Sequence, residues 1–166
     1  LASTLTPSWG MYAGYELYEH VRFKEGGEEY RDSEKYEIKI RDWAGAEKLG
    51  MTLSPFIAQL NKIRRENVAL QRLRNLEFHP TDSQAILAYS KRDGDNLILV
   101  VVNLDPARVQ ETMVHWNMYM LGLPEGTFKV NDLLTGETME WSDHTFLRLD
   151  PARPHGRVGH IVKVSI

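Results

Sequence analysis

Apolar and polar residues follow two different periods along the chain, and the change falls near residues 74–76. Downstream of this point, short apolar runs are separated by Gly- and Pro-containing turns, which is typical of antiparallel strands. Asp93-Gly94 predicts a hairpin between the first two runs. Strands of this length and spacing predict an antiparallel β-sandwich for residues 76–166. The predicted strands are 85–91, 96–104, 112–116, 127–131, 146–149 and 161–166.

A helical period precedes the strands. Ser54 is a good N-cap, and Pro55 suits the first helical position because no amide donor is needed there. Residues 55–69 are therefore predicted to form a helix, with Arg64, Arg65 and Glu66 facing away from its apolar stripe. The stripe consists of Phe56, Leu60, Ile63 and Leu70.

The first 53 residues carry a weaker pattern. Residues 10–15 are an apolar run bracketed by glycines, and we interpret them as a short buried strand that runs into a polar loop. Residues 16–53 contain ten acids and seven bases. A loop of this length is usually functional or disordered, and its five aromatic residues argue against plain disorder.

Composition excludes several classes of function. A net charge of −3 gives no electrostatic argument for nucleic acid or for an anionic membrane, and no apolar stretch approaches the ~20 residues of a membrane helix. The absence of cysteine excludes disulfides and thiolate metal sites. The six histidines are scattered, and there is no phosphate-binding or dinucleotide-binding glycine motif. We therefore predict no cofactor and no metal.

Candidate chemistry lies within residues 16–53. Asp32–Tyr36 and Arg41–Trp43 combine carboxylates, cations and aromatic rings, a composition suited to a polyhydroxylated ligand. Lys35 offers three hydrogen-bond donors, and Tyr36 offers a flat apolar face with a hydroxyl. From the residues alone, an ion pair of Lys35 with a neighbouring acid on a solvated loop is the stronger interpretation.

Two further features of this segment invite a functional interpretation. Glu16 and Glu19 lie near the end of the predicted strand and suggest a catalytic pair, but we favour a structural role, in which Glu16 anchors the loop or hydrogen-bonds a neighbouring strand. For Arg41, Asp42 and Trp43 we favour an ion pair between the first two, with the tryptophan pinning the loop in place.

The order of strand, long loop, helix and β module resembles the end of the α-amylase clan, where a (β/α)8 barrel is followed by a β-sandwich. A finer resemblance is to the bacterial α-1,4-glucan:maltose-1-phosphate maltosyltransferases, and it is most specific between residues 8 and 43. The residues that carry it are Ser8–Leu17, Glu28-Glu29-Tyr30, Asp32–Ile38, Arg41-Asp42-Trp43, Asp132–Gly136 and Trp141.

The resemblance implies an α+β fragment dominated by β structure. Residues 1–75 would hold the last strand (10–15) and the last helix (55–69) of the barrel, and residues 76–166 would form the C-terminal sandwich. It also implies a chain that is the C-terminal end of a larger, cytoplasmic and homodimeric enzyme. That enzyme would have α-maltose 1-phosphate and an α-1,4-glucan as its substrates.

Retaining glycosyl transfer requires two carboxylates, and the resemblance implies that both, together with a third stabilising carboxylate, lie upstream of Leu1. No catalytic residue is therefore expected in this chain. Lys35 and Tyr36 are implied to bind the donor.

Two other functions remain open. A non-catalytic glucan-binding or structural sandwich would expose aromatic side chains on one sheet face, and Trp116, Tyr119 and Trp141 are the candidates. The chain could also end another hydrolase or a branching enzyme of the clan. The Asp32–Tyr36 and Arg41–Trp43 motifs argue against that possibility.

Overall fold

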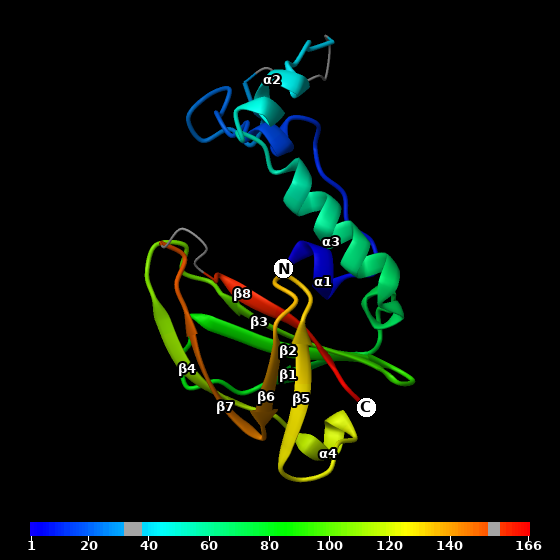
Figure 1. The fold of residues 1–166 in the computed structure, drawn as a ribbon. Coiled ribbons are helices and arrows are strands. Elements are labelled where there is room, and N and C mark those ends of the chain that lie inside the picture. Colours follow the sequence, from blue (N-terminus) through cyan, green and yellow to red (C-terminus); the bar gives the residue numbers. More distant parts are fainter. Residues whose placement is uncertain (32–37, 153–156) are drawn as a thin grey trace. The chain divides into compact units, whose positions relative to one another are not determined.

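The computed structural model describes residues 1–31, 38–152 and 157–166 (Figure 1). The chain divides into two compact units. The β unit consists of Leu1–Ser8 and Ile63–Ile166, and the loop unit consists of Trp9–Lys62. The β unit therefore combines two pieces of chain that are far apart in sequence.

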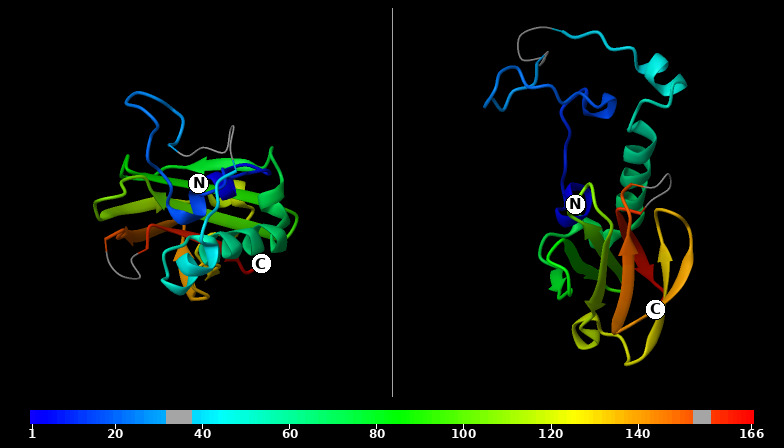
Figure 2. Two further views of the ribbon diagram at one scale, coloured as in Figure 1. Left: turned by 90° about the horizontal axis from the view of Figure 1, so that it is seen from above. Right: turned by 90° about the vertical axis from the view of Figure 1, so that its left-hand side faces the viewer.

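Antiparallel strands make up most of the β unit (Figures 1 and 2). One sheet has the strand order β1-β2-β3-β8-β5-β6, and β4 pairs with β7 in a second sheet. The strands are β1 (Leu76–His79), β2 (Ile86–Asp93), β3 (Asn96–Asn103), β4 (Gln110–His115), β5 (Thr127–Asp132), β6 (Thr138–Ser142), β7 (His144–Leu149) and β8 (Gly159–Val164).

All six predicted strands are present, as β2, β3, β4, β5, β7 and β8. The predicted hairpin is also confirmed, because Asp93 pairs with Asn96 and Gly94 takes a left-handed φ of 59°. The two strands absent from the prediction, β1 and β6, are the two edges of the larger sheet. Edge strands of four and five residues bury few side chains, so they leave little apolar alternation in the sequence.

The core lies between the two sheets. Leu97, Leu99 and Val101 of β3 belong to it, together with side chains from β4 and β7 and from α4 (Met118–Leu121). Burial of apolar surface at about 25 cal/mol per Å² makes this cluster the main source of stability in the β unit.

The opposite face of β3 is buried as well. Ile98 and Val100 point away from Leu99 because successive side chains in a strand alternate, and they are 0% and 1% exposed. The short 3-10 helix η2 (Val68–Gln71) contacts β2 and β3, and its Leu70 is fully buried. A strand buried on both faces explains the uninterrupted apolar run at 97–102.

The first eight residues are held to the β unit by polar contacts. Thr4, in α1 (Ala2–Leu5), shares a 2.5 Å hydrogen bond with Tyr89 of β2. Arg64 donates to the carbonyl oxygens of Ser3, Thr6 (3.0 Å) and Pro7 (2.6 Å). These bonds satisfy backbone acceptors that would otherwise be left open after a helix of one turn.

Lys91 of β2 adds a second buried cation to the same region. Its Nζ donates to the carbonyl oxygens of Arg72 (2.6 Å) and Leu5 (3.4 Å), and the residue is 0% exposed. Desolvation by burial, followed by repulsion from Arg64, lowers the pKa of Lys91.

The predicted helix is confirmed as α3 (Ser54–Glu66), which starts in the loop unit and ends in the β unit. It stops three residues before the predicted end because Asn67 takes an extended conformation (φ −126°, ψ 99°). The Asn67 side chain donates to the carbonyl of Ile63 and accepts from Asn96 (3.0 Å). Leu70 is therefore a buried residue of η2, and it does not belong to the apolar stripe of α3 as predicted.

The strand predicted at residues 10–15 is wrong. The backbone there is irregular and leads into the 3-10 helix η1 (Tyr15–Leu17). Gly14 has a left-handed φ of 100°, and its carbonyl accepts from the amides of Leu17 (3.0 Å) and Glu19 (3.1 Å). A parallel strand needs a neighbouring strand to accept its hydrogen bonds. Here the backbone amides of Tyr15, Leu17, Tyr18 and Glu19 instead bond to carbonyls three to five residues earlier in the chain.

None of the helices in the described residues has the length and apolar character needed to cross a lipid bilayer.

His79 gives the β unit a testable pH dependence. The residue is 5% exposed, its Nε2 lies 2.8 Å from Ser90 Oγ, and the Asn117 amide donates to its Nδ1 (3.4 Å). This arrangement needs neutral imidazole. Desolvation by burial lowers the pKa of His79 from 6.5 to about 4.

A His whose folded-state pKa is below its unfolded value destabilises the fold as pH falls through the interval between them. Between about pH 7 and about pH 4.5, wild type should lose about 2 kcal/mol of unfolding free energy relative to His79→Gln. Urea unfolding of both proteins across this range measures the difference. A difference that does not change with pH would contradict the assignment.

Candidate functional site

The predicted donor-binding residues Lys35 and Tyr36 lie outside the described residues, together with Asp32, Ser33 and Glu34. The structure describes the two flanks of this segment: the first flank ends at residue 31, and the second begins at residue 38. On the first flank, the amide of Phe23 donates to the carbonyl of Glu29 (2.9 Å), and that of Arg31 donates to Val21 (2.7 Å). Residues 21–31 thus form a small hydrogen-bonded hairpin.

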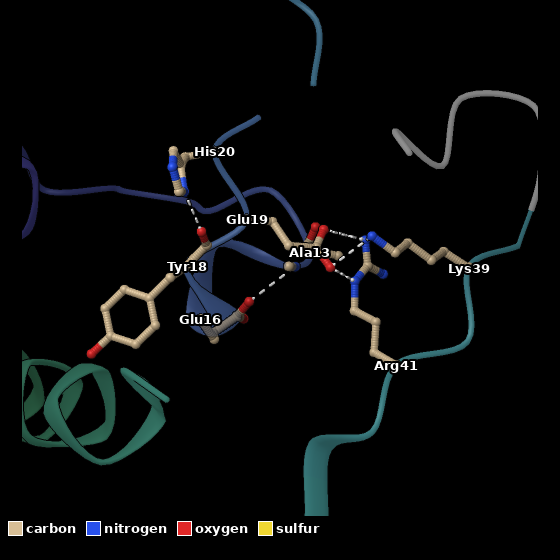
Figure 3. A network of polar contacts seen from close by, with 8 residues as sticks. Ala13, Glu16, Tyr18, Glu19, His20, Lys39 and Arg41 are labelled. Carbon is tan, nitrogen blue, oxygen red and sulfur yellow. Dashed lines mark hydrogen bonds and ion pairs between the residues drawn. The ribbon is translucent and has the colours of Figure 1, made fainter. Parts of the chain in front are cut away.

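The second flank is held by Glu19 (Figure 3). Arg41 Nε lies 2.9 Å from Glu19 Oε1, and Arg41 Nη2 donates to Glu19 Oε2 (3.1 Å) and to the carbonyl of Ala13 (3.2 Å). Lys39 Nζ lies 2.9 Å from Glu19 Oε1. The Arg41 side chain is 4% exposed and that of Glu19 is 25% exposed, so this forked pair is partly shielded from solvent, and its two parallel contacts define its geometry.

Glu19 is an anion in this arrangement. The hydrogen bond from Arg41 is the largest cause of its lowered pKa, with Lys39 acting in the same direction. A carboxyl that must donate a proton requires a raised pKa, so the geometry does not suit a general acid. Glu19 is a structural ligand for two cations.

Glu16 is also structural. Its side chain accepts from the amide of Gly14 (3.1 Å), and its carbonyl accepts from the amide of Leu53 (2.8 Å) and from Thr52 Oγ1 (3.2 Å). Glu16 thus ties the start of the long segment to its end, which is the anchoring role expected from the sequence.

Gly14 is the residue that allows the Glu19–Arg41 pair to form. A Cβ at this position would collide with the Glu19 carboxylate and lie 3.0 Å from Arg41 Nε. Its φ of 100° also disfavours any other residue. Glu19 was not predicted as the partner of Arg41. The available signal in the sequence was Gly14, because a glycine can mark a position where another part of the chain approaches the backbone closely.

The predicted ion pair between Arg41 and Asp42 is wrong. Asp42 is instead the N-cap of α2 (Trp43–Lys48), and its Oδ1 accepts from the amide of Gly45 (2.8 Å). An aspartate at this position satisfies an otherwise unpaired amide of the first turn. Trp43 is the first residue of the helix and is 44% exposed.

The aromatic platform that a glucan-binding module would need is not formed by the predicted residues. Trp116 and Trp141 are 3% and 4% exposed and stack at 5.7 Å with an interplanar angle of 14°. They face the core because both lie on inward positions of the sandwich. Tyr119 is 90% exposed, on α4. Two of the three residues are thus core residues, which contradicts that prediction.

Within the described ranges, no group of three or more His, Asp or Glu side chains could hold a metal ion. His160 is buried, and its Nδ1 lies 2.7 Å from Asp132 Oδ2, which is a structural pair between β8 and β5.

Comparison with known families decides the identity of the fold. A family model described as "GLGE, C-terminal" matches residues 78–164, from β1 to the end of β8. The chain belongs to this family. The match covers the β unit from its first strand to its last.

Relatives extend the similarity into the loop unit. The chain is 51% identical over 166 residues to α-1,4-glucan:maltose-1-phosphate maltosyltransferase 1 of Streptomyces coelicolor, which covers 99% of this chain and 25% of that protein. It is 50% identical over 164 residues to the maltosyltransferase of Corynebacterium glutamicum, with 97% and 24% covered. The chain thus spans about a quarter of the length of these relatives.

A solved structure shares the fold. The chain superposes on CldA, a cyclomaltodextrin glucanotransferase with a three-domain ABC distribution, with a TM-score of 0.59 at 19% identity. The superposition covers 94% of this chain and 29% of that one.

Replacing Gly14 tests the arrangement in the loop unit. Gly14→Ala should break the Glu19–Arg41 pair, because the new Cβ occupies the position of the carboxylate and the backbone conformation is strained. The pKa of Glu19 should then rise toward its usual value, and NMR titration of its side chain measures this. Gly10→Ala is the matched control, since nothing lies within 4 Å of a Cβ there. Equal behaviour of the two variants would contradict the role of Gly14.

Proposed function

We propose that this chain is the C-terminal part of a maltosyltransferase that transfers maltosyl from α-maltose 1-phosphate to the non-reducing end of an α-1,4-glucan and releases phosphate. The observation that carries the proposal is 51% identity, along 99% of the chain, to a protein whose name states this donor and acceptor. The proposal gives the chain a place in bacterial α-glucan synthesis, in the cytoplasm, as part of a homodimeric enzyme.

The chemistry would be performed outside this chain. Transfer with retention of configuration uses a nucleophile and a general acid/base about 5–5.5 Å apart. Glu16 and Glu19, the acidic pair that the sequence suggested for such a role, both make structural contacts. We therefore assign the catalytic carboxylates to the remaining three quarters of the enzyme.

The loop unit would complete the barrel in this proposal, with residues 1–75 ending the catalytic domain and residues 76–166 forming the sandwich. Its described residues include no buried hydrophobic side chain, and several of its apolar residues are strongly exposed. Exposed apolar surface of this kind marks an interaction site, which supports packing against the rest of the enzyme. The most exposed are Ile40 (94%), Ile38 (93%), Leu49 (73%), Phe23 (67%) and Met51 (63%).

Lys35 and Tyr36 would bind the donor. The support is indirect and comes from the flanks of their segment. The amide of Arg31 bonds to Val21 before it, and Lys39 and Arg41 are fixed by Glu19 after it. A binding loop with fixed ends loses less conformational entropy when the ligand binds.

The isolated chain should have no transferase activity. We expect no phosphate release above background from maltose 1-phosphate with glycogen present, while the full-length enzyme under the same conditions releases phosphate. Turnover by the isolated chain at about 1–10³ per second would contradict the proposal.

Substituting Lys35 in the full-length enzyme tests donor binding. Lys35→Ala should remove a charge-assisted hydrogen bond worth about 1.5–3 kcal/mol, so kcat/KM should fall on the order of ten- to a hundredfold. Tyr36→Phe keeps the ring and should cost less.

Lys24→Ala is the matched control, because it removes a lysine that is exposed and lies outside the predicted donor-binding segment of the loop unit. Unchanged kinetics for Lys35→Ala would show that Lys35 does not contact the donor. A loss equal to that of Lys24→Ala would show that only general charge matters.

A further inference from the structure

Two histidines face each other at one end of the β4–β7 sheet. His115 of β4 and His144 of β7 are directly opposite in the register, and their Nδ1 atoms are 2.9 Å apart. Their ring centroids lie 4.9 Å apart with an interplanar angle of 76°. The side chains are 36% and 61% exposed, so both imidazole rings are partly open to solvent.

Each imidazole has a carboxylate on its other nitrogen. Asp82 Oδ1 lies 2.7 Å from His115 Nε2, and Asp143 Oδ2 lies 3.6 Å from His144 Nε2. The four side chains thus form a line of successive contacts, in which the carboxylates of Asp82 and Asp143 stand on either side of the two imidazoles.

This line is built on paired backbone. The amide of His115 donates to the carbonyl of Pro80 (2.9 Å), and the amide of Asp82 donates to Met113 (3.1 Å). Thr81 forms a bridge with Val114, so residues 80–82 lie alongside β4 as a short extra pairing. Three hydrogen-bonded segments therefore fix the positions from which the side chains project.

Asp82 determines the tautomer of His115. Its carboxylate accepts a hydrogen bond from the Nε2–H of His115, which leaves the lone pair of His115 Nδ1 free to act as an acceptor. His144 donates its Nδ1 proton to it in the metal-free protein. A change of tautomer at His144 would move that proton to Nε2, which faces Asp143. The Nδ1 atom of His144 would then carry a lone pair next to that of His115 Nδ1.

We propose that His115 and His144 form a two-nitrogen site for a transition-metal cation, with Cu²⁺ as the preferred ion and Ni²⁺ next. Metal-bound histidines almost always donate their other ring N–H to a carboxylate, carbonyl or water. Asp82 is within hydrogen-bond distance of His115 Nε2, whereas Asp143 Oδ2 lies 3.6 Å from His144 Nε2 and would have to move closer to accept from it. Water completes the coordination, because the described part of the chain offers no third ligand in this cluster.

The separation of the two nitrogens favours one coordination geometry. An ion about 2.0–2.1 Å from both Nδ1 atoms would be bound at an angle of roughly 90°, the angle between neighbouring ligands in square-planar geometry. Tetrahedral Zn²⁺ would need the nitrogens farther apart. For a site of nitrogen donors, Cu²⁺ also stands above Ni²⁺ and Zn²⁺ in intrinsic affinity.

The other described histidines do not offer this arrangement. His79 and His160 are buried and use their ring nitrogens in structural hydrogen bonds. His20 is exposed, and its Nδ1 bonds to the carbonyl of Tyr18 (2.6 Å). His20 is therefore a matched control for a histidine outside the site.

The test is a Cu²⁺ titration of the 166-residue chain by calorimetry, with electron paramagnetic resonance to count equatorial nitrogens. Wild type should bind one equivalent that shows two nitrogens. His144→Asn should bind that equivalent at least tenfold more weakly, and His20→Asn should bind it as wild type does. Asp82→Asn should weaken it by about 10–100-fold, which is the usual effect of removing such a carboxylate.

Thermal unfolding without metal shows whether each variant still folds. His144 is exposed, so its substitution keeps the test valid even if His115→Asn is unstable. Equal binding by wild type and His144→Asn, or an equal loss in His20→Asn, would overturn the site. Tighter binding of Zn²⁺ than of Cu²⁺ would overturn the geometric argument.

Discussion

The burial of β3 on both faces is the constraint on which the β unit depends. Leu97 and Leu99 face the core between the sheets, while Ile98 and Val100 face the opposite side and are equally buried. One sheet packed on another can cover only the first set. The second set requires a further layer, and η2 contributes to it through Leu70. The β unit is therefore more than a sandwich, because it includes chain from outside residues 76–166.

This extra layer brings backbone polar groups into an apolar environment, where each unpaired group would cost free energy. Arg64 and Lys91 provide the compensation, since Arg64 donates to carbonyl oxygens of the first eight residues and Lys91 donates to those of Leu5 and Arg72. The cost is desolvation of the cations themselves, which lowers the pKa of both side chains. Long polar side chains thus hold the layer together where a purely apolar interface would leave carbonyls unsatisfied.

Sequence reasoning succeeded where a structure is local and failed where it depends on distant partners. The inner strands were predictable because their apolar pattern is visible in consecutive residues. By contrast, β1 and β6 are edge strands that bury little surface. The segment 10–15 looked like a strand from its apolar content, but an apolar run does not specify its hydrogen-bonding partners.

The candidate site shows the same limit. Arg41 pairs with Glu19, 22 positions away, and no local pattern distinguishes that acid from the adjacent Asp42. Trp116 and Trp141 were predicted as surface candidates, yet aromatic residues serve cores and binding faces alike, and their stacking became evident only in the folded protein. Lys35 and Tyr36 remain predictions from the family resemblance.

The two pieces of the β unit have a consequence for how the chain tolerates change. Because Arg64 bonds to Ser3, Thr6 and Pro7, the chain leaves the β unit at Ser8 and returns to it at Ile63, and everything between is a closed loop in the thermodynamic sense. The entropy of closing such a loop grows only with the logarithm of its length, so doubling it costs about 0.6 kcal/mol. The β unit therefore places little energetic restriction on the length of the segment between its two pieces, and that segment can be lengthened or shortened in evolution while the sheets keep their packing.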